Sequence, residues 1–292
     1  MNKNQNSEIK NKNKKSVKDI LSTQITFADI KKGYSYVQSS VTNIHNKIRF
    51  INTFWLKLLA VITMTIDHTA VMFGLVYYKE YDAYLLSRDM SLDTYENMRI
   101  IGRIAFPIFC FLIVEGFFHT KNIIKYSTRL FIFALISQVP FSLVLYRSPF
   151  IKNGNLNVYF TLFLGLLAVA FLDYFYQKYK NEEVPGISTL IPGVIVAGVA
   201  AYVADLLHTD YGSLGVLIIL LFYIFRKHPI LLFIGLYTLI YNLSDTTEMY
   251  ALWALIPILL HNGKKGPGLK YFFYLYYPLH LTVLFLLNQY II

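Results

Sequence analysis

Leu56–Gly74, with the sequence LKLLAVITMTIDHTAVMFG, is the stretch that decides how the rest of the chain must fold. It is long and apolar enough to cross a bilayer as one helix, yet Asp67 and His68 stand side by side well inside it. An acidic residue at this depth costs about 2.5–3.5 kcal/mol, so it needs a partner charge, a water-filled cavity or a function. The rest of the chain must supply the residues that face this pair.

The composition indicates a membrane protein. Of 292 residues, 55% are hydrophobic and only 15% are charged, which is more apolar material than one globular core can bury. The net charge is +10, but Lys and Arg concentrate near the N-terminus and in short loops, a pattern typical of membrane topology rather than of nucleic acid binding. The single cysteine, Cys110, lies in an apolar run, which favours a small buried hydrophobe over a nucleophile.

The chain divides by composition into two parts. Residues 1–52 form a polar, Lys- and Asn-rich tail, which we expect to be disordered over residues 1–18 and to include one interfacial helix within residues 19–48. Residues 53–292 form a transmembrane domain with nine apolar runs, of which the sixth to eighth are short, so the number of spans is between eight and ten. The runs lie near residues 54–78, 100–118, 127–146, 158–176, 188–206, 212–225, 229–243, 249–261 and 271–291.

The charges of the loops predict the orientation. With the basic tail in the cytoplasm, every second connection is also rich in Lys and Arg, as the positive-inside rule requires. We therefore predict an all-α polytopic protein with about nine spans, a cytoplasmic N-terminus and an external C-terminus. The predicted cytoplasmic connections hold Lys121, Lys125 and Arg129; Lys178 and Lys180; Arg226 and Lys227; and Lys264, Lys265 and Lys270.

Depth along the helices predicts which residues meet. Asp67 and His68 lie about 20 Å from the cytoplasmic start of the first span, and Arg103 lies about 6 Å from the outer start of the second. The three can therefore share one level, with Arg103 as the counter-ion of Asp67. This arrangement can be an ion pair that only joins two helices. Beside a carboxylate, however, His68 can also be held as a general base.

The second run, Arg99–Thr120, reads RIIGRIAFPIFCFLIVEGFFHT and contains a proline at the charged level. Pro107 cannot donate a hydrogen bond to the carbonyl of Arg103, so we expect a kink there. Glu115 and His119 lie at the cytoplasmic end of this run. Glu115 either pairs with Lys121 or Arg129 or borders a site for a cytoplasmic cofactor.

Polar residues also adjoin the apolar runs on the outer side. Asn157 precedes the fourth span, and Asp210 and Tyr211 precede the sixth, so we expect these three to contact a substrate. His280 lies about 15 Å into the last span, near mid-membrane, and is a further candidate. We find no Gly-rich phosphate loop, no GxSxG motif and no metal-ligand spacing, so we expect no metal.

Seven segments, in order, resemble the TraX family of bacterial membrane proteins. The similarity runs from about residue 56 to residue 292 and leaves the N-terminal tail uncovered. The segments are LKLLAVITMTIDH, RIIGRIAFPIFCFLIVEGFFHT, KYSTRLFIFALISQVPF, LNVYFTLFLGLL, DYGSLGVLIIL, EMYALWALIPILL and KYFFYLYYPLHL.

The resemblance implies an activity. A member of this family acetylates the N-terminus of conjugative F-type pilin, which implies acetyl-CoA as the donor and the bacterial plasma membrane as the location. The family is also distantly similar to transmembrane acyltransferases that acetylate sugars and glycans, in which a membrane-embedded His and Arg serve the transfer. By analogy, His68 and Arg103 would take these roles here.

We therefore expect a membrane-embedded acetyltransferase. Acetyl-CoA would bind from the cytoplasm, His68, oriented by Asp67, would deprotonate the acceptor, and Arg103 would stabilise the oxyanion. The acceptor, a pilin-like protein, glycan or small molecule, would enter from the outer face. A proton-coupled or small-molecule transporter explains the buried charges equally well, and a non-catalytic assembly factor is a third alternative. The expected donor site comprises Glu115, His119, Lys121 and Arg129.

Overall fold

The computed structural model describes residues 29, 32–33, 35–37, 39–40, 48–78, 83–86, 90–148, 154–180 and 185–291. The chain divides into two compact units, Met1–Lys47 and Ile48–Ile292, and each is considered by itself. In the first unit the described residues are helical, within the segment where a helix is predicted. The stretch predicted to be disordered, residues 1–18, lies outside the described residues.

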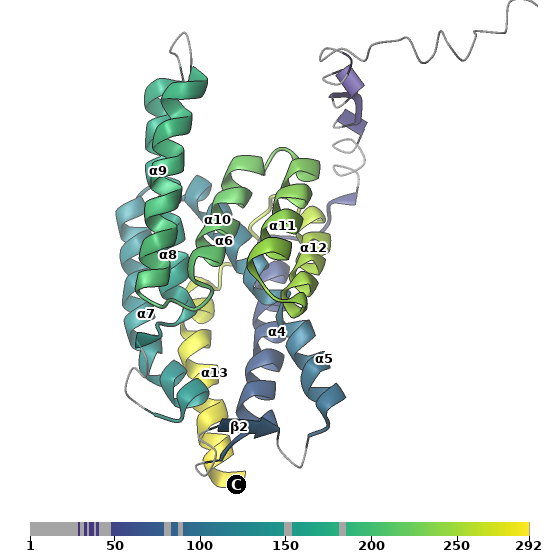
Figure 1. Ribbon diagram of the computed structural model, residues 1–292, viewed down its shortest axis with the longest axis vertical. Helices are drawn as coiled ribbons and strands as arrows, with labels where there is room; N and C mark the ends of the chain where they lie inside the picture. The colour runs from purple at the N-terminus through teal and green to yellow at the C-terminus, as the bar shows by residue number, and fades with distance from the viewer. Residues whose placement is uncertain are drawn as a thin grey trace, which may run out of the picture. The chain divides into compact units, whose positions relative to one another are not determined.

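The second unit is a helical bundle (Figure 1), and the predicted all-α class is confirmed. In the described ranges its helices form nine segments, one at each predicted apolar run. They are α4 (Thr53–Gly74), α5 (Leu92–Gly102) with α6 (Ala105–His119), α7 (Ile123–Tyr146), α8 (Val158–Tyr179), α9 (Pro185–Leu206), α10 (Gly212–Phe225), α11 (Pro229–Leu243), η2 (Thr246–Ala254) with α12 (Leu255–Leu259), and α13 (Lys270–Ile291).

The first predicted run extends too far. Helix α4 ends at Gly74, and the next four residues form strand β1 (Leu75–Tyr78), which pairs with β2 (Ala83–Leu86) in an antiparallel hairpin. Both strands are composed mainly of aliphatic and aromatic residues, which also favour extended structure, so hydropathy alone did not separate helix from strand here.

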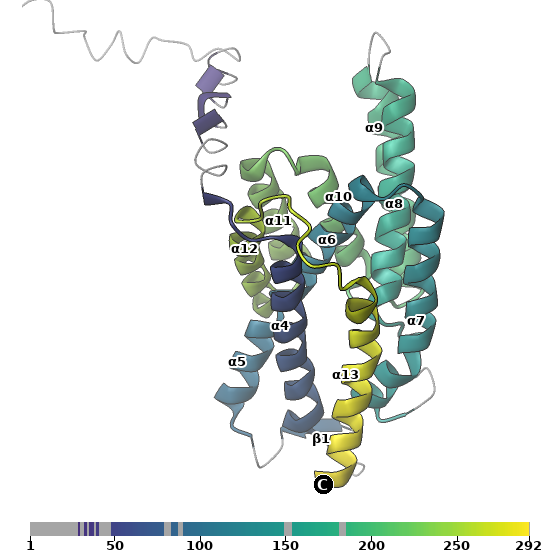
Figure 2. The ribbon, with the colours of Figure 1, turned by 180° about the vertical axis from the view of Figure 1, so that it is seen from behind.

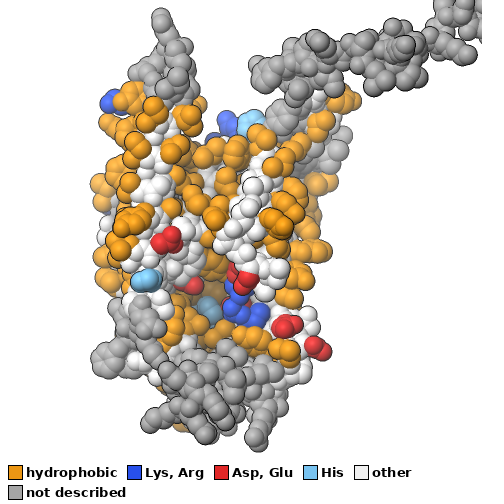
Figure 3. Space-filling model, viewed as in Figure 1, with side chains coloured by type: hydrophobic (Ala, Val, Ile, Leu, Met, Phe, Trp, Pro, Cys, Tyr) orange, Lys and Arg blue, Asp and Glu red, His pale blue; other side chains and the backbone are white. Residues whose placement is uncertain are grey.

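The bundle lies in a membrane. Among the residues that the structure describes, four segments are long and apolar enough to cross it: α4, Leu92–His119, α7 and α8. The shorter apolar helices include α10, α11 and Thr246–Leu259, which correspond to the short sixth, seventh and eighth runs. Hydrophobic side chains cover most of the face seen in Figure 3. With the repeated apolar helices, this surface identifies a multi-pass membrane protein.

Side chains at the helix ends explain where several helices begin. Ser91, Asn122 and Asn157 each accept a hydrogen bond from a backbone N–H in the first turn of α5, α7 and α8. Such caps satisfy N–H groups that have no partner inside the helix. The helix is interrupted one turn before Pro107, since α5 ends at Gly102 and α6 begins only at Ala105. The missing hydrogen bond of this proline explains the interruption.

The first helix of the bundle begins and its last helix ends at opposite ends of the unit, as expected. Figures 1 and 2 both show the C-terminal end of α13, the β1–β2 hairpin and the N-terminal end of α5 at one end of the unit. The N-terminal end of α4 lies toward the opposite end. This arrangement agrees with an odd number of crossings, and which end faces the cytoplasm stays a prediction.

Candidate functional site

A cavity of about 300 Å³, here called the charged cavity, lies among α4, α5, α6, α10, η2 and α13. Figure 3 shows a hollow in the lower half of the molecule where basic, acidic and histidine side chains gather within a hydrophobic surround. The charged cavity brings together most of the residues predicted for catalysis and substrate binding. Its titratable lining includes Asp67, His68, Arg99, Arg103, Asp210, Tyr211 and Glu248.

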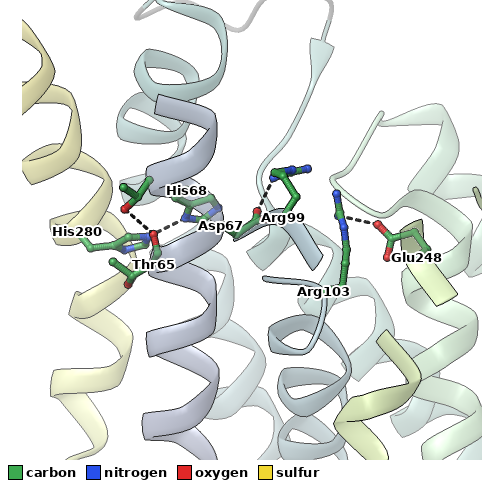
Figure 4. Close-up of polar contacts among 8 residues, drawn as sticks. Thr65, Asp67, His68, Arg99, Arg103, Glu248 and His280 are labelled. Carbon is green, nitrogen blue, oxygen red and sulfur yellow. Dashed lines mark hydrogen bonds and ion pairs between the residues drawn. The ribbon is translucent and has the colours of Figure 1, made fainter. Parts of the chain in front are cut away.

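Two separate ion pairs cross the charged cavity (Figure 4). The Nη1 atom of Arg99 lies 2.6 Å from Oδ2 of Asp67, and Nη1 of Arg103 lies 2.6 Å from Oε1 of Glu248. The prediction that Arg103 is the counter-ion of Asp67 is therefore wrong. Helix α5 begins at Leu92, well before the predicted run, so Arg99 lies within a helix beside α4 rather than at a membrane edge.

Gly102 allows α5 to approach α4 closely at this level. A Cβ atom added to Gly102 would lie 2.3 Å from Cβ of Asp67 and 2.4 Å from its Oδ1. No side chain larger than hydrogen fits beside the carboxylate without displacing it. In the described part of the chain, Asp67 Oδ1 and Arg103 Nε are buried and have no hydrogen-bond partner.

His68 is bonded to another histidine. Its Nδ1 lies 2.8 Å from Nε2 of His280, and Nδ1 of His280 lies 2.9 Å from the carbonyl oxygen of Tyr276 (Figure 4 shows the two rings). The sequence predicted that Asp67 orients His68, but the carboxylate is bound to Arg99 instead. The structure thus brings the two membrane histidines together, although they are 212 positions apart in the chain.

A strained loop carries Asp210 and Tyr211 into the charged cavity. Tyr211 has φ 67°, a left-handed conformation that costs a non-glycine residue about 1–3 kcal/mol. Its ring stacks on Phe106 with centroids 3.6 Å apart, and the backbone N–H of Asp210 donates to the Leu156 carbonyl at 2.7 Å. Burial, reinforced by the negative charge of Asp67, raises the pKa of Asp210 to about 7.

Asn157 does not reach the cavity. Its side chain is fully buried, and its Oδ1 accepts from the backbone N–H of Tyr159 at 3.0 Å. Its Nδ2 donates to the carbonyl of Ala134 at 2.7 Å and to Oε1 of Gln138 at 2.8 Å. Because both ends of the amide already have partners, Asn157 caps α8 and joins it to α7, and we do not retain it as a substrate-binding residue.

A second cavity of about 420 Å³ lies near the other end of α4 and α6. Three residues of the predicted donor site, Glu115, His119 and Arg129, line it, whereas Lys121 does not. Lys57 and Lys265 add two basic side chains to the lining. Among the described residues, Phe109 alone lines both cavities.

Several site residues were missed in the sequence. Arg99 and Glu248 were not among the predicted site residues, because each lies at the end of an apolar run, where a charged side chain is ordinarily solvated. The four-residue spacing of Arg99 and Arg103 could have indicated that both face one side of a helix. Lys265 belongs to the loop GKKGPG, where the paired lysines were interpreted only as a topology signal.

Comparisons with known proteins identify the family of the chain. The chain is 32% identical over 259 residues to a probable fimbrial assembly protein FimC, serogroup H1, of Dichelobacter nodosus, covering 80% of this chain and 94% of that protein. It is 29% identical over 170 residues to an uncharacterised protein of Rickettsia prowazekii (strain Madrid E), covering 58% of this chain and 54% of that protein. No solved structure matches the chain. The family model described as TraX protein matches residues 53–288, the whole helical bundle, and the chain therefore belongs to the TraX family.

Proposed function

We propose that this protein is a membrane-embedded acyltransferase that moves an acetyl group from acetyl-CoA to an acceptor. The observation that carries the proposal is the pair of cavities that share Phe109 in their linings. One has basic side chains in its lining, and the other contains a buried imidazole beside two arginines. This arrangement suits a donor and an acceptor that approach from opposite sides of a membrane.

The second cavity suits the donor. Lys57, Arg129 and Lys265 would bind the phosphates of acetyl-CoA through charge-assisted hydrogen bonds. The apolar lining from Leu112 and Ile113 toward Phe109 would hold the pantetheine arm. Acetyl-CoA supplies the acyl group as a thioester.

The charged cavity suits the transfer. His68 would take the proton of the acceptor amine or hydroxyl as the acceptor atom bonds to the acyl carbon. The carbon–sulfur bond breaks, and His68 returns the proton to the departing sulfur. Arg103 would donate hydrogen bonds to the oxygen that becomes negative, which is most effective in a cavity poor in water. Asp210 and Tyr211 would contact the acceptor.

The acceptor that we propose is a pilin-like membrane protein. The family resemblance suggests it, and the Dichelobacter nodosus relative is described as a probable fimbrial assembly protein. Glycans and small molecules are the acceptors to compare in the same assay.

The test is turnover of labelled acetyl-CoA by protein reconstituted in nanodiscs. CoA release should require an extract of the host membrane, and His68→Ala should abolish it without reducing insertion. The control is His208→Asn, which removes an exposed imidazole outside both cavities and keeps a residue type that tolerates the φ of 47° at that position.

Two results would overturn the proposal. One is wild-type CoA release by His68→Ala, which removes the base. The other is transport of a solute across the membrane with no CoA release in any extract, which would favour the transporter.

A further inference from the structure

The hydrogen bonds of His280 fix where its proton lies. A carbonyl oxygen can only accept, so the contact between His280 Nδ1 and the Tyr276 carbonyl at 2.9 Å requires a hydrogen on Nδ1. In a neutral imidazole the other nitrogen, Nε2, then carries a lone pair. The contact of 2.8 Å to His68 must in that case be donated by Nδ1 of His68.

This order of donors decides which nitrogen of His68 is free. With its hydrogen on Nδ1, neutral His68 has its lone pair on Nε2. The two nitrogens lie on opposite sides of the ring, so Nε2 points away from His280. His68 lines the charged cavity, whereas His280 is not part of its lining. The Nε2 lone pair is therefore the proton acceptor that the histidine pair offers to the cavity.

We propose that His280 is a positioning residue that holds His68 in the Nδ1-protonated tautomer and so leaves Nε2 as the base. The inference rests on the proposed acyl transfer. A carboxylate usually orients a catalytic histidine in this way. Here Asp67 is bound to Arg99, and the acceptor of the Nδ1 hydrogen is an imidazole that is itself oriented by the backbone.

Packing between α4 and α13 keeps the pair in place. The rings of His68 and His280 lie nearly in one plane, with centroids 5.1 Å apart and an interplanar angle of 17°, as a hydrogen bond between their edges requires. The ring of Tyr276 also packs on the ring of His280, with centroids 5.2 Å apart. The hydroxyl of Tyr276 is 2.8 Å from Oγ1 of Thr65, which links α13 to α4. His280 is 8% exposed, so water competes little for its hydrogen bonds.

The proton balance requires no charge on His280. In the transfer, the acceptor proton moves to Nε2 of His68, and the imidazolium that forms keeps its Nδ1 hydrogen bond to His280. When the carbon–sulfur bond breaks, the same proton leaves Nε2 for the sulfur of CoA. His280 ends each turnover with the hydrogen on Nδ1 that it had at the start.

Two substitutions of His280 separate the two hydrogen bonds. His280→Gln places an amide oxygen near the former Nε2, so it can still accept from His68. His280→Asn places its amide near the former Nδ1 and leaves His68 without an acceptor. The ring ¹⁵N signals of His68, assigned with His68→Gln in ¹⁵N-histidine-labelled protein in nanodiscs, distinguish a protonated from an unprotonated nitrogen directly.

We expect protonated Nδ1 and unprotonated Nε2 for His68 in the wild type and in His280→Gln, and the other tautomer in His280→Asn. CoA release should fall about 100-fold in His280→Asn and stay near the wild type in His280→Gln, because the base is misdirected only in the former. Since the wild-type spectrum suffices to test the assignment, poor folding of a variant does not remove the test.

Each remaining outcome is decisive. A protonated Nε2 on wild-type His68, or a His68 tautomer unchanged in His280→Asn, would overturn the positioning role. If the tautomers are as expected but the protein releases no CoA with any acceptor, His280 does set the tautomer of His68, and the proposed acyl transfer is wrong.

Discussion

In the charged cavity, the two arginines form ion pairs with two different carboxylates. Each arginine has its own carboxylate, Asp67 for Arg99 and Glu248 for Arg103, and all four side chains are between 15% and 21% exposed. In such a site the loss of one partner is more harmful than the loss of both, because the remaining charge stays buried without compensation.

These ion pairs predict which second substitution restores the stability that a first substitution removes. Arg99→Gln alone should cost about 3–5 kcal/mol, and adding Asp67→Asn should recover most of the loss. Arg103→Gln should be recovered by Glu248→Gln in the same way. Membrane yield and melting temperature in detergent measure the effect. If Asp67→Asn restored Arg103→Gln better than Arg99→Gln, the observed pairing would be incorrect.

The close approach at Gly102 gives a second prediction. Gly102→Ala should destabilise the protein by about 1–3 kcal/mol and lower CoA release, because the new Cβ must displace Asp67 from Arg99. The matched control is Gly198→Ala in α9, where a Cβ meets nothing within 4 Å. That change should be neutral or stabilise by up to about 1 kcal/mol. Equal melting temperatures for the two variants would refute the steric argument.

At the scale of elements, hydrogen bonds join the start of α4 to the segment after α12. The Nε of Arg49 donates to the carbonyl of His261, and Nε2 of His261 is 3.1 Å from Oγ1 of Thr53. Ile51 and His261 also form an isolated backbone bridge. The contact joins segments more than two hundred positions apart and closes the end of the bundle that holds the second cavity.

The burial of His261 in this contact predicts that the stability of the protein depends on pH. Burial, together with the charge of Arg49, lowers the pKa of His261 to about 4, against an ordinary value of 6.5. Between these pH values the unfolded chain binds a proton that the folded chain excludes, so stability should fall as the pH falls through this window. In His261→Gln the fall in melting temperature should be smaller, whereas the exposed-site control His208→Asn should follow the wild type. A parallel decline in His261→Gln would exclude His261 as the cause.

Helix α6 supplies a residue that lines both cavities. If Phe109 limits how far an acyl chain extends, Phe109→Ala should raise the ratio of butyryl to acetyl transfer by about tenfold. Phe111→Ala is the control, since Phe111 lies on the same helix, packs on Phe222 and lines neither cavity. Competition between butyryl-CoA and acetyl-CoA measures the ratio. An unchanged ratio in Phe109→Ala would show that the ring does not select the acyl group.

At the scale of the whole molecule, the sidedness of the bundle connects the cavities to their compartments. The second cavity lies near the basic loop Gly263–Leu269. For the proposed acyl transfer, this cavity would have to open to the cytoplasm, where acetyl-CoA is found. The charged cavity, the hollow in the lower half of Figure 3, lies toward the end where Figure 1, in the same view, shows the C-terminus of α13.

The topology can be measured with reporters. An enzyme that is active only outside the cytoplasm, fused after Ile292, should be active, and the same fusion near Lys180 should be inactive, because the loop charges favour this orientation. A fusion after Lys265 should also be inactive. Activity at Lys265 would place the second cavity outside the cytoplasm and remove its supply of acetyl-CoA.

The sequence by itself determined the local features of this protein. Runs of apolar residues located all nine helical segments, and Pro107 located the break between α5 and α6. These features depend on hydropathy and on hydrogen bonds between residues about four positions apart, so they can be inferred without knowledge of the rest of the fold. The same local information placed Asp67 and His68 in the second half of the first helix, and Asp210 and Tyr211 just before the start of the sixth helical segment.

Only the tertiary structure decided which of these residues touch. Depth along a helix is fixed by counting residues, but the partner of a side chain also depends on how each helix is rotated and which helix lies beside it. For this reason Arg99 took the place expected for Arg103, and His280 the place expected for Asp67. Asn157 was turned toward Gln138 and away from the cavity, because packing of α7 on α8 determines its direction.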